Sequence, residues 1–517
     1  MDLGSALSIA TSGLEGTQYA LGVVSQNVSN ASTTGYVAEN ANLNATDTVG
    51  TGSGISIGLT TRNVNDALQN SLYTQNAQVA SLTVQDNSLS AITSLQGSMS
   101  ADSGSTGTLS DEVGNLSNAI TSLISTPTDS TARSTVVADA STLATSINTM
   151  SSAYQTQRQA AQDSIVDEVS SINTDLTTIG VLSKQIMSLK VQGLSTADLE
   201  NQRASAMSDL SSYISVSYTE TAKGDMLVKT ADGTQLPTYP TNSENTVLST
   251  YPSDGSSALQ ATSTWPLSTE DATLSATSSI TASSSSSYVP AITFVSSDKA
   301  LDSSKDLTSD LTGGSLGANI TLRDTVYPKM QAQLDSFAYT LASRFDSAGL
   351  TLFTDSSGAV PASSTTSKDP DGIVGFSSNI QVSASVSADP SVLSTSGSTT
   401  LAQTLLSTAL NGTDPVAPTS GLGVNGNIST GYAGNQTLAN LATALTSSQA
   451  TVASTATTSL ATATTVQTSL TTKVSNVSGV DVDNEMSKLV ALQNAYTANA
   501  KVITAVKAMF TALLDAV

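Results

Sequence analysis

The final stretch of the chain, residues 482–517, reads VDNEMSKLVALQNAYTANAKVITAVKAMFTALLDAV. At alternating spacings of four and three it presents an apolar side chain at almost every step, and only Gln493 and Lys507 interrupt the pattern. The positions are Val482, Met486, Leu489, Gln493, Tyr496, Ala500, Ile503, Lys507, Phe510, Leu514 and Val517. Such a repeat is typical of a helix that lies along other helices. We predict one long helix, with Asp481 and Asp483 as helix-start acids.

Residues 1–28, MDLGSALSIATSGLEGTQYALGVVSQNV, carry the same repeat. Its positions are Leu3, Leu7, Ala10, Leu14, Thr17, Leu21, Val24 and Val28. Four glycines weaken this segment as an isolated helix, by about 1 kcal/mol each relative to alanine. Because a matching stripe stands at each end of the chain, we predict that the two ends pair. Two readings stay open: the pair is loose until neighbouring copies cover it, or it is an ordinary core pair of one globular domain.

Composition limits the functions that the chain can have. It has 517 residues, a net charge of −23, 11% charged residues, and neither cysteine nor histidine. The length predicts three or four structural units, and the sparse basic residues argue against nucleic acid and anionic membranes as partners. Chemistry based on thiols or imidazoles is excluded. We predict no catalytic, cofactor or metal site, no Sec signal peptide and no membrane insertion.

Prolines separate helical flanks from an irregular middle, since none of the twelve lies in 1–126 or 419–517. Helical periodicity continues longest through 133–190, which we expect to break once or twice. A period of two at Ile214, Val216 and Tyr218 predicts a β-hairpin. Further helical spacing is found at 72–99, 113–123, 326–341 and from Leu438 onward, and an extended arm is expected near Ile55 and Ile57.

These patterns predict a mainly α protein, in which both termini form a long helical coiled-coil or bundle rod with inserted β-rich outer domains. The predicted units are 1–35 with 480–517 as the terminal helical domain; 36–215 with 313–350 and 431–479 as the helical rod; 216–312 as an inserted β-rich domain; and 353–430 as a second loop-rich or β insertion.

Four separated segments carry recognisable motifs. The N-terminal motif includes Asn27, Asn30, Gly35 and Tyr36, whereas Ser29, Ser32 and Thr34 stand where alanine, asparagine and proline are usual. The C-terminal motif includes Ser478-Gly479-Val480, Glu485-Met486, Leu489, Tyr496 and Ile503. The internal motifs are Leu199-Glu200-Asn201-Gln202-Arg203, in which Ala204 replaces the usual following acid, and Gly313-Gly314-Ser315-Leu316-Gly317 followed by Leu322-Arg323-Asp324.

On these motifs the chain resembles the FlgK family of flagellar hook-associated proteins. The terminal motifs are shared with hook and rod proteins, and the internal motifs single out the junction family. The resemblance implies a structural, non-enzymatic protein that is exported unfolded through the flagellar type III apparatus and is extracellular at the hook–filament junction. It implies a ring-like layer of copies between hook protein and the second hook–filament junction protein, and an export chaperone that holds the C-terminal segment.

The predicted assembly interface consists of apolar stripe residues, which are Leu3, Leu7, Leu14, Leu21, Val28, Met486, Leu489, Tyr496, Ile503, Phe510 and Leu514. Within the chain we expect the N-terminal stripe from Leu7 to pack with Leu489, Tyr496, Ile503, Phe510 and Leu514. Alternative functions are another flagellar axial protein (hook or distal rod), a secreted Ser/Thr-rich surface adhesin, and an enzyme that acts on sugars through paired carboxylates.

Overall fold

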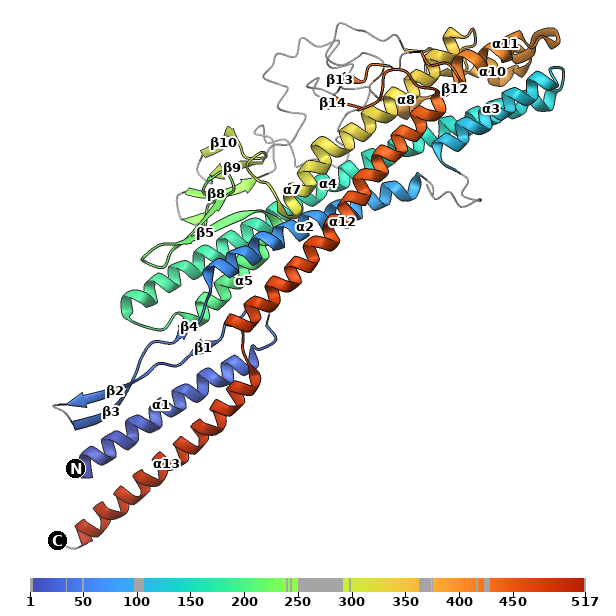
Figure 1. Cartoon of the computed structure of the whole chain (residues 1–517). Coiled ribbons are helices and arrows are strands. Elements are labelled where there is room, and N and C mark those ends of the chain that lie inside the picture. The colour runs from blue at the N-terminus through green and yellow to red at the C-terminus, as the bar shows by residue number, and fades with distance from the viewer. Residues whose placement is uncertain are drawn as a thin grey trace.

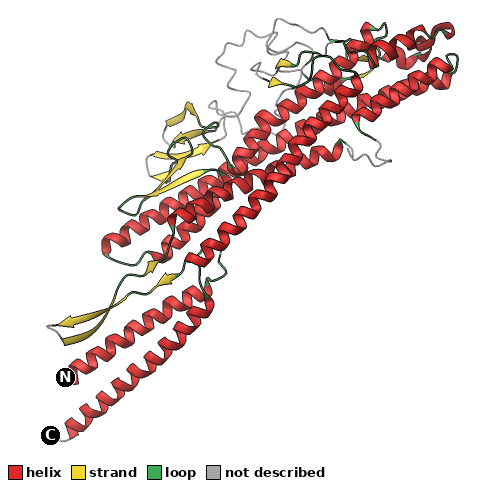
Figure 2. Ribbon diagram, viewed as in Figure 1, coloured by secondary structure: helices red, strands yellow, loops and turns green. Residues whose placement is uncertain are grey.

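The computed structural model describes residues 3–33, 35–48, 51–96, 107–238, 240–241, 244–249, 292–296, 299–361, 373, 375–414, 417–422 and 428–515. The molecule is an elongated rod of helices, and both chain ends lie at the same end of it (Figure 1). Small strands lie beside the rod (Figure 2). The mainly α architecture with small β insertions is confirmed.

The rod is built from long helices that are far apart in the sequence. Helix α2 packs along α12, whereas α4 contacts α3, α5, α7 and α8. Their bounds are α2 (Asp66–Leu95), α3 (Leu109–Ser125), α4 (Ser130–Gln192), α5 (Ala197–Tyr213), α7 (Gly314–Thr321), α8 (Tyr327–Ser347) and α12 (Leu438–Ser478), with a π-helical turn η2 (Leu322–Val326) between α7 and α8. At the end of the rod, α1 (Leu3–Ser29) packs along α13 (Val482–Asp515).

Helix α4 is unbroken over 63 residues, so the expected breaks within 133–190 are wrong. The helix is closed at both ends, because the Asp129 side chain accepts the Thr131 N–H at 2.8 Å and Gly193 adopts a left-handed φ of 67°. Between these caps a changing set of helices covers the apolar stripe. Packing against these helices keeps α4 helical even where the apolar periodicity of its sequence weakens.

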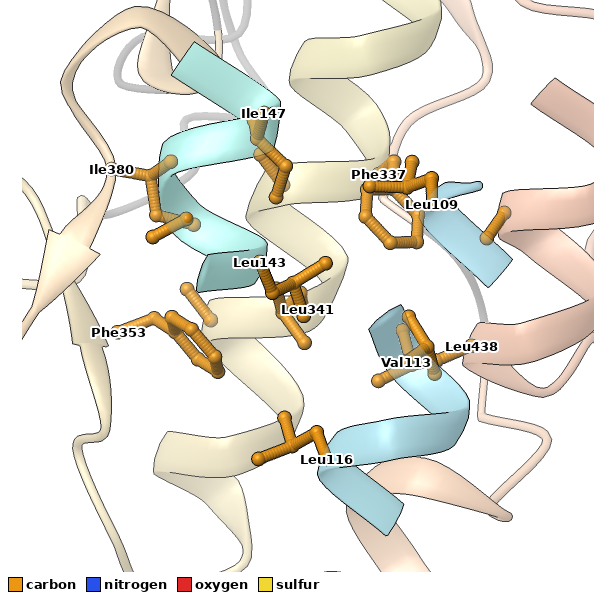
Figure 3. Packing of buried hydrophobic residues seen from close by; sticks show 14 of the residues in the cluster. Leu109, Val113, Leu116, Leu143, Ile147, Phe337, Leu341, Phe353, Ile380 and Leu438 are labelled. Atoms are coloured by element: carbon orange, nitrogen blue, oxygen red, sulfur yellow. The ribbon is translucent and has the colours of Figure 1, made fainter. Parts of the chain in front are cut away.

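Two hydrophobic cores share α4. The first surrounds its N-terminal half, from Val136 to Ala161, and takes side chains from α3, α8 and α12. Figure 3 shows this core, with Leu143 of α4 beside Leu341 of α8 and with Val113 of α3 beside Leu438 of α12. The second surrounds the C-terminal half of α4 and includes α5 and α7. One helix therefore ties both cores into a single rod.

Residues 353–430, expected to be a loop-rich or β insertion, contain more short helices than strands in their described part. The helical turns are α9 (Phe376–Asn379), α10 (Ala384–Ala388), η3 (Pro390–Gly397), α11 (Thr400–Thr404) and η4 (Leu405–Leu410). The strands are β11 (Phe353–Thr354), β12 (Gln381–Val382), β13 (Ser420–Leu422) and β14 (Ile428–Ser429). Phe353, Phe376 and Leu405 are buried in the first core. Apolar burial on α4 and α8 orders this segment despite its Ser- and Pro-rich composition.

The expected extended arm and β-hairpin are both present. The arm is a hairpin of β2 (Leu43–Thr48) and β3 (Thr51–Ile57), flanked by β1 (Glu39–Asn40) and β4 (Thr61–Arg62), which pair with each other. The other hairpin pairs β5 (Val216–Glu220) with β6 (Met226–Thr230). Beyond it β7 (Pro240–Thr241), β8 (Glu244–Ser249), β9 (Thr293–Ser296) and β10 (Lys299–Asp306) form one antiparallel sheet. Most of the Ser-rich part of 216–312 lies outside the described residues, and the four-unit division stays a prediction.

The described helices include none that is both long and apolar enough to cross a membrane.

The rod interior also contains polar groups. On α8 the buried Asp335 carboxylate accepts N–H bonds from Gly375 at 2.9 Å, Ser377 at 3.0 Å and the Gln331 amide at 3.1 Å. Burial nevertheless raises the pKa of Asp335 to about 6, and these hydrogen bonds oppose the shift.

Replacing Phe337 with alanine should lower the free energy of unfolding of the rod by about 3–5 kcal/mol, because the ring is fully buried and leaves a cavity. Urea unfolding followed by circular dichroism measures the change. The matched control is Phe510→Ala on α13, where the ring is 37% exposed and rod stability should hold. Equal losses in the two variants would contradict the core assignment.

Asp335 should make rod stability depend on pH. Its folded-state pKa of about 6 lies above the ordinary value of 3.8, so its stabilising contribution is fully present below 3.8 and is lost as pH rises through 6. Asp335→Asn removes this titration. The difference in unfolding free energy, wild type minus variant, should therefore grow as pH falls from neutral to about 4. A difference independent of pH would contradict the raised pKa.

Candidate assembly interface

Helices α1 and α13 form an antiparallel pair whose register is fixed at two places. Near the rod, the Asn27 amide donates to Glu485 Oε2 at 3.1 Å. Midway along the pair, Gly13 lies so close to α13 that an added Cβ would come within 2.9 Å of Asn499 Nδ2. Both contacts agree on one register, which continues along the pair to Leu3 opposite Met509.

The last turn of α13 extends past the start of α1. Figure 1 shows the C-terminal end of α13 reaching beyond the N-terminal end of α1. Four large apolar side chains at this end of α13 are exposed by between 37% and 76%, and we call them the apolar tip: Met509, Phe510, Leu513 and Leu514. Side chains of this size gathered on one exposed end mark an interaction surface.

The predicted stripe residues of α13 divide into two groups. Leu489 and Ile503 are partly covered in the pair, and the fully buried apolar position is Val506, which the predicted stripe did not include. Met486 and Tyr496 are exposed, and Phe510 and Leu514 belong to the apolar tip. In this register α13 extends past the start of α1, so the expected packing of Leu514 on α1 is not found in the single chain, where its side chain is 76% exposed.

The five α1 residues of the predicted assembly interface are all only partly covered. These residues are Leu3, Leu7, Leu14, Leu21 and Val28. The buried positions of α1 are mainly the smaller side chains on its two covered faces, such as Ala10, Ala20 and Val24. In the single chain the large N-terminal apolar residues thus keep surface free for contact. Their role in assembly stays a prediction.

Two of the four glycines that weaken α1 as an isolated helix allow neighbouring elements to pack closely against it. Gly13 allows the close approach of α13, whereas a Cβ on Gly16 would come within 2.3 Å of Ile55 Cδ1 in the β2–β3 hairpin. Helix α1 is therefore held between α13 on one side and the hairpin on another. Small residues at these two positions let both neighbours approach closely.

The N-terminal motif lies at the joint between the terminal pair and the rod. Asn27 is fully buried at the end of α1, and the Tyr36 hydroxyl donates to its side-chain oxygen at 3.0 Å. Asn30 bonds back to the Gln26 carbonyl at 3.0 Å, and Gly35 adopts a left-handed φ of 79° that turns the chain toward β1. The motif residues therefore shape the exit of the chain from α1.

Arg203 of the first internal motif is buried and anchors the turn of the β5–β6 hairpin. It donates to the Gly224 carbonyl and to Glu220 Oε2, at 2.8 and 2.7 Å. The ionic partner of Arg203 is therefore Glu220, since position 204 holds alanine and not an acid. Burial works against the Glu220 charge, but Lys190 and Arg203 together hold the pKa of Glu220 below its usual value. The neighbouring Gln202 is exposed on α5.

The glycine motif makes a close backbone crossing. Gly314 has a φ of 62°, and an added Cβ would come within 2.2 Å of the Tyr213 carbonyl group at the end of α5. Gly313 has a φ of 68° and would place a Cβ 2.8 Å from Ser215 Cβ. Only glycine suits both the positive φ and the approach. Leu316 and Gly317, in the first turns of α7, are buried below this crossing.

Arg323 and Asp324 form a structural ion pair in the π-helical turn η2. Arg323 is fully buried and binds Asp324 with two nitrogens, at 2.8 and 2.7 Å, while its third donates to Gln162 Oε1 at 2.6 Å. The Arg158 side chain donates to the Arg323 carbonyl at 2.8 Å. These contacts tie η2 to α4.

In the part of the chain that the structure describes, no group of three or more acidic residues could hold a metal ion.

Comparison with known proteins identifies the family. The family model described as the flagellar hook-associated protein FlgK helical domain matches residues 92–358, which is more than half of the chain. A flagellar basal body rod protein model matches residues 7–36, and the C-terminal model of the flagellar basal body rod FlgEFG proteins matches residues 473–516. No curated protein sequence gave a match.

Among solved structures, the flagellar hook junction protein FlgK from Burkholderia pseudomallei is similar, with 22% identity and a TM-score of 0.40. The match covers 57% of this chain and 47% of that one, so it spans about half the length of the solved protein. This likeness alone does not establish a function. The family model, together with the axial-protein matches at both ends, does establish the family: the chain belongs to the FlgK family of flagellar hook-associated proteins.

Proposed function

We propose that this protein is a structural, non-enzymatic component of the bacterial flagellum that joins hook to filament by self-assembly through α1 and α13. The observation that carries the proposal is the apolar tip, in which Leu514 is 76% exposed and Leu513 57%. Family membership supports the flagellar role, and the axial-protein matches cover the two helices that form the terminal pair.

The partner of the apolar tip is a second copy of the chain. The tip continues the covered seam of the α1–α13 pair, so a neighbouring pair that is offset along its axis presents the same kind of apolar surface to it. The large residues of α1 that stay partly exposed, including Leu3 and Leu7, lie at the same end of the molecule. Contacts of this head-to-tail type generate a ring or a helical layer when repeated.

The remaining partners are those that membership of the FlgK family suggests. Hook protein would contact one side of the layer, and the second hook–filament junction protein the other. A chaperone that holds the C-terminal segment before assembly would cover the apolar tip while the protein is in the cytoplasm. The assembled protein is extracellular at the hook–filament junction, and it reaches this place unfolded and without a Sec signal. The rod, with its small sheets, faces outward.

Substituting Leu514 with aspartate should leave hooks without filaments and release flagellin into the medium, because a charge at the apolar tip opposes burial between copies. Electron microscopy of hooks and immunoblotting of the medium measure the two effects. The purified variant should keep its helical circular dichroism, since Leu514 lies beyond the covered seam. In contrast, Ile503→Asp in the seam should loosen the terminal pair itself.

The matched control is Thr504→Asp, which puts the same charge on an exposed polar position of α13. This strain should carry normal filaments. Normal filaments in the Leu514→Asp strain, with the protein present at wild-type levels, would contradict assembly through the apolar tip.

A further inference from the structure

Two buried asparagines hold the joint between the terminal helix pair and the rod. Asn27 stands at the end of α1 and is fully buried, and Asn201 lies on α5 of the rod and is 5% exposed. Between them runs the short segment from Val37 to Glu39, which enters β1. Both asparagines bond to this one segment, Asn27 at Glu39 and Asn201 at both Val37 and Glu39.

Asn27 uses its full hydrogen-bonding capacity. Its amide nitrogen donates to the Glu39 carbonyl at 2.8 Å and to Glu485 Oε2 at 3.1 Å. Its oxygen accepts from the Glu39 N–H at 2.9 Å and from the Tyr36 hydroxyl at 3.0 Å. Two donors and two acceptor positions are all that an asparagine side chain has. One residue thus connects α1, β1 and α13.

Asn201 repeats the pattern from the rod. Its nitrogen donates to the Val37 carbonyl at 3.1 Å and to Glu39 Oε1 at 2.9 Å, and its oxygen accepts the Val37 N–H at 3.2 Å. Burial and nearby acids raise the pKa of Glu39, and the Asn201 amide opposes this shift. Without Asn201, the Glu39 carboxylate would stay buried but would lose this hydrogen-bond donor.

The last component comes from the far end of the sequence. Glu485 is 3% exposed in the first turn of α13, where one of its oxygens accepts from Lys488 Nζ at 2.6 Å and the other from Asn27. The joint is therefore complete only when α13 lies against α1. In the rod, by comparison, the helices are held by extensive apolar cores.

From this geometry we propose that Asn27 and Asn201 form a latch that fixes the direction of the α1–α13 pair relative to the rod, and that Glu485 closes it when α13 docks. The two asparagines are positioning residues. This inference deepens the proposed function, since copies that assemble side by side must present their terminal pairs in one direction, but the latch itself is a property of the single chain.

The test uses the absence of native cysteine, which allows clean spin labelling. One label is placed at the exposed Gln18 on α1 and one at the exposed Thr178 on α4, after Gln18→Cys and Thr178→Cys. Double electron–electron resonance on the isolated full chain then reports the distribution of distances between pair and rod. The unsubstituted joint should give one narrow peak. Asn27→Ala, Asn201→Ala and Glu485→Ala should each lose this peak and give a broad distribution.

Matched controls separate latching from general damage. Asn30→Ala removes an asparagine of the same helix end whose side chain bonds only to its own turn, and Gln202→Ala removes the exposed neighbour of Asn201. Both should keep the narrow peak. Glu485→Gln should keep it as well, because the amide oxygen still accepts from Asn27. A second label pair within α4, at Thr145 and Thr178, should stay narrow in every variant and so shows that the rod is folded.

A narrow peak in both Asn27→Ala and Asn201→Ala would overturn the latch, as would a broad distribution in the unsubstituted joint. Because the measurement uses single chains in solution, it does not depend on hook binding. Loss of filaments in cells tests the proposed function, whereas the distance distribution tests the latch, so the two can fail separately.

Discussion

The antiparallel register between α1 and α13 is the constraint on which the rest of the structure depends. It is set by a hydrogen bond from Asn27 to Glu485 and by the close approach of Gly13 to Asn499. Since α1 has 27 residues and α13 has 34, this register leaves the apolar tip uncovered. It also brings Glu485 to the joint. The exposed apolar tip and the position of Glu485 at the joint are thus two results of one alignment.

Hydrophobic periodicity predicted the elements well because most of the chain is helical and the stripes are long. The 4-3 repeats marked both terminal helices, and the start of α12 at Leu438 was read directly from the pattern. Asp481 indeed caps α13, since its carboxylate accepts the N–H groups of Asp483 and Asn484. Local chemistry of this kind is visible in the sequence because cap and helix are neighbours.

What the sequence could not show depends on residues far apart. The glycines of α1 counted only as poor helix formers, since their use becomes clear when α13 and Ile55 are in place. The motif Leu199-Glu200-Asn201-Gln202-Arg203 does not by itself reveal the role of Asn201. An asparagine in a helix gives no periodic signal, and its partners Val37 and Glu39 lie more than 160 residues away. The uncovered apolar tip likewise required the relative length and register of both helices.

The pairing of the two chain ends has a consequence for biosynthesis. Asn27 and Glu485 are separated by 458 positions, so the terminal pair is among the most non-local contacts that a chain of this length can make. Contacts of such separation form late, because the intervening chain must first be brought together. A polypeptide still emerging from the ribosome lacks α13 and with it the closing residue. The N-terminal helix therefore stays without its partner, with its apolar face open to other molecules, until α13 has been synthesised.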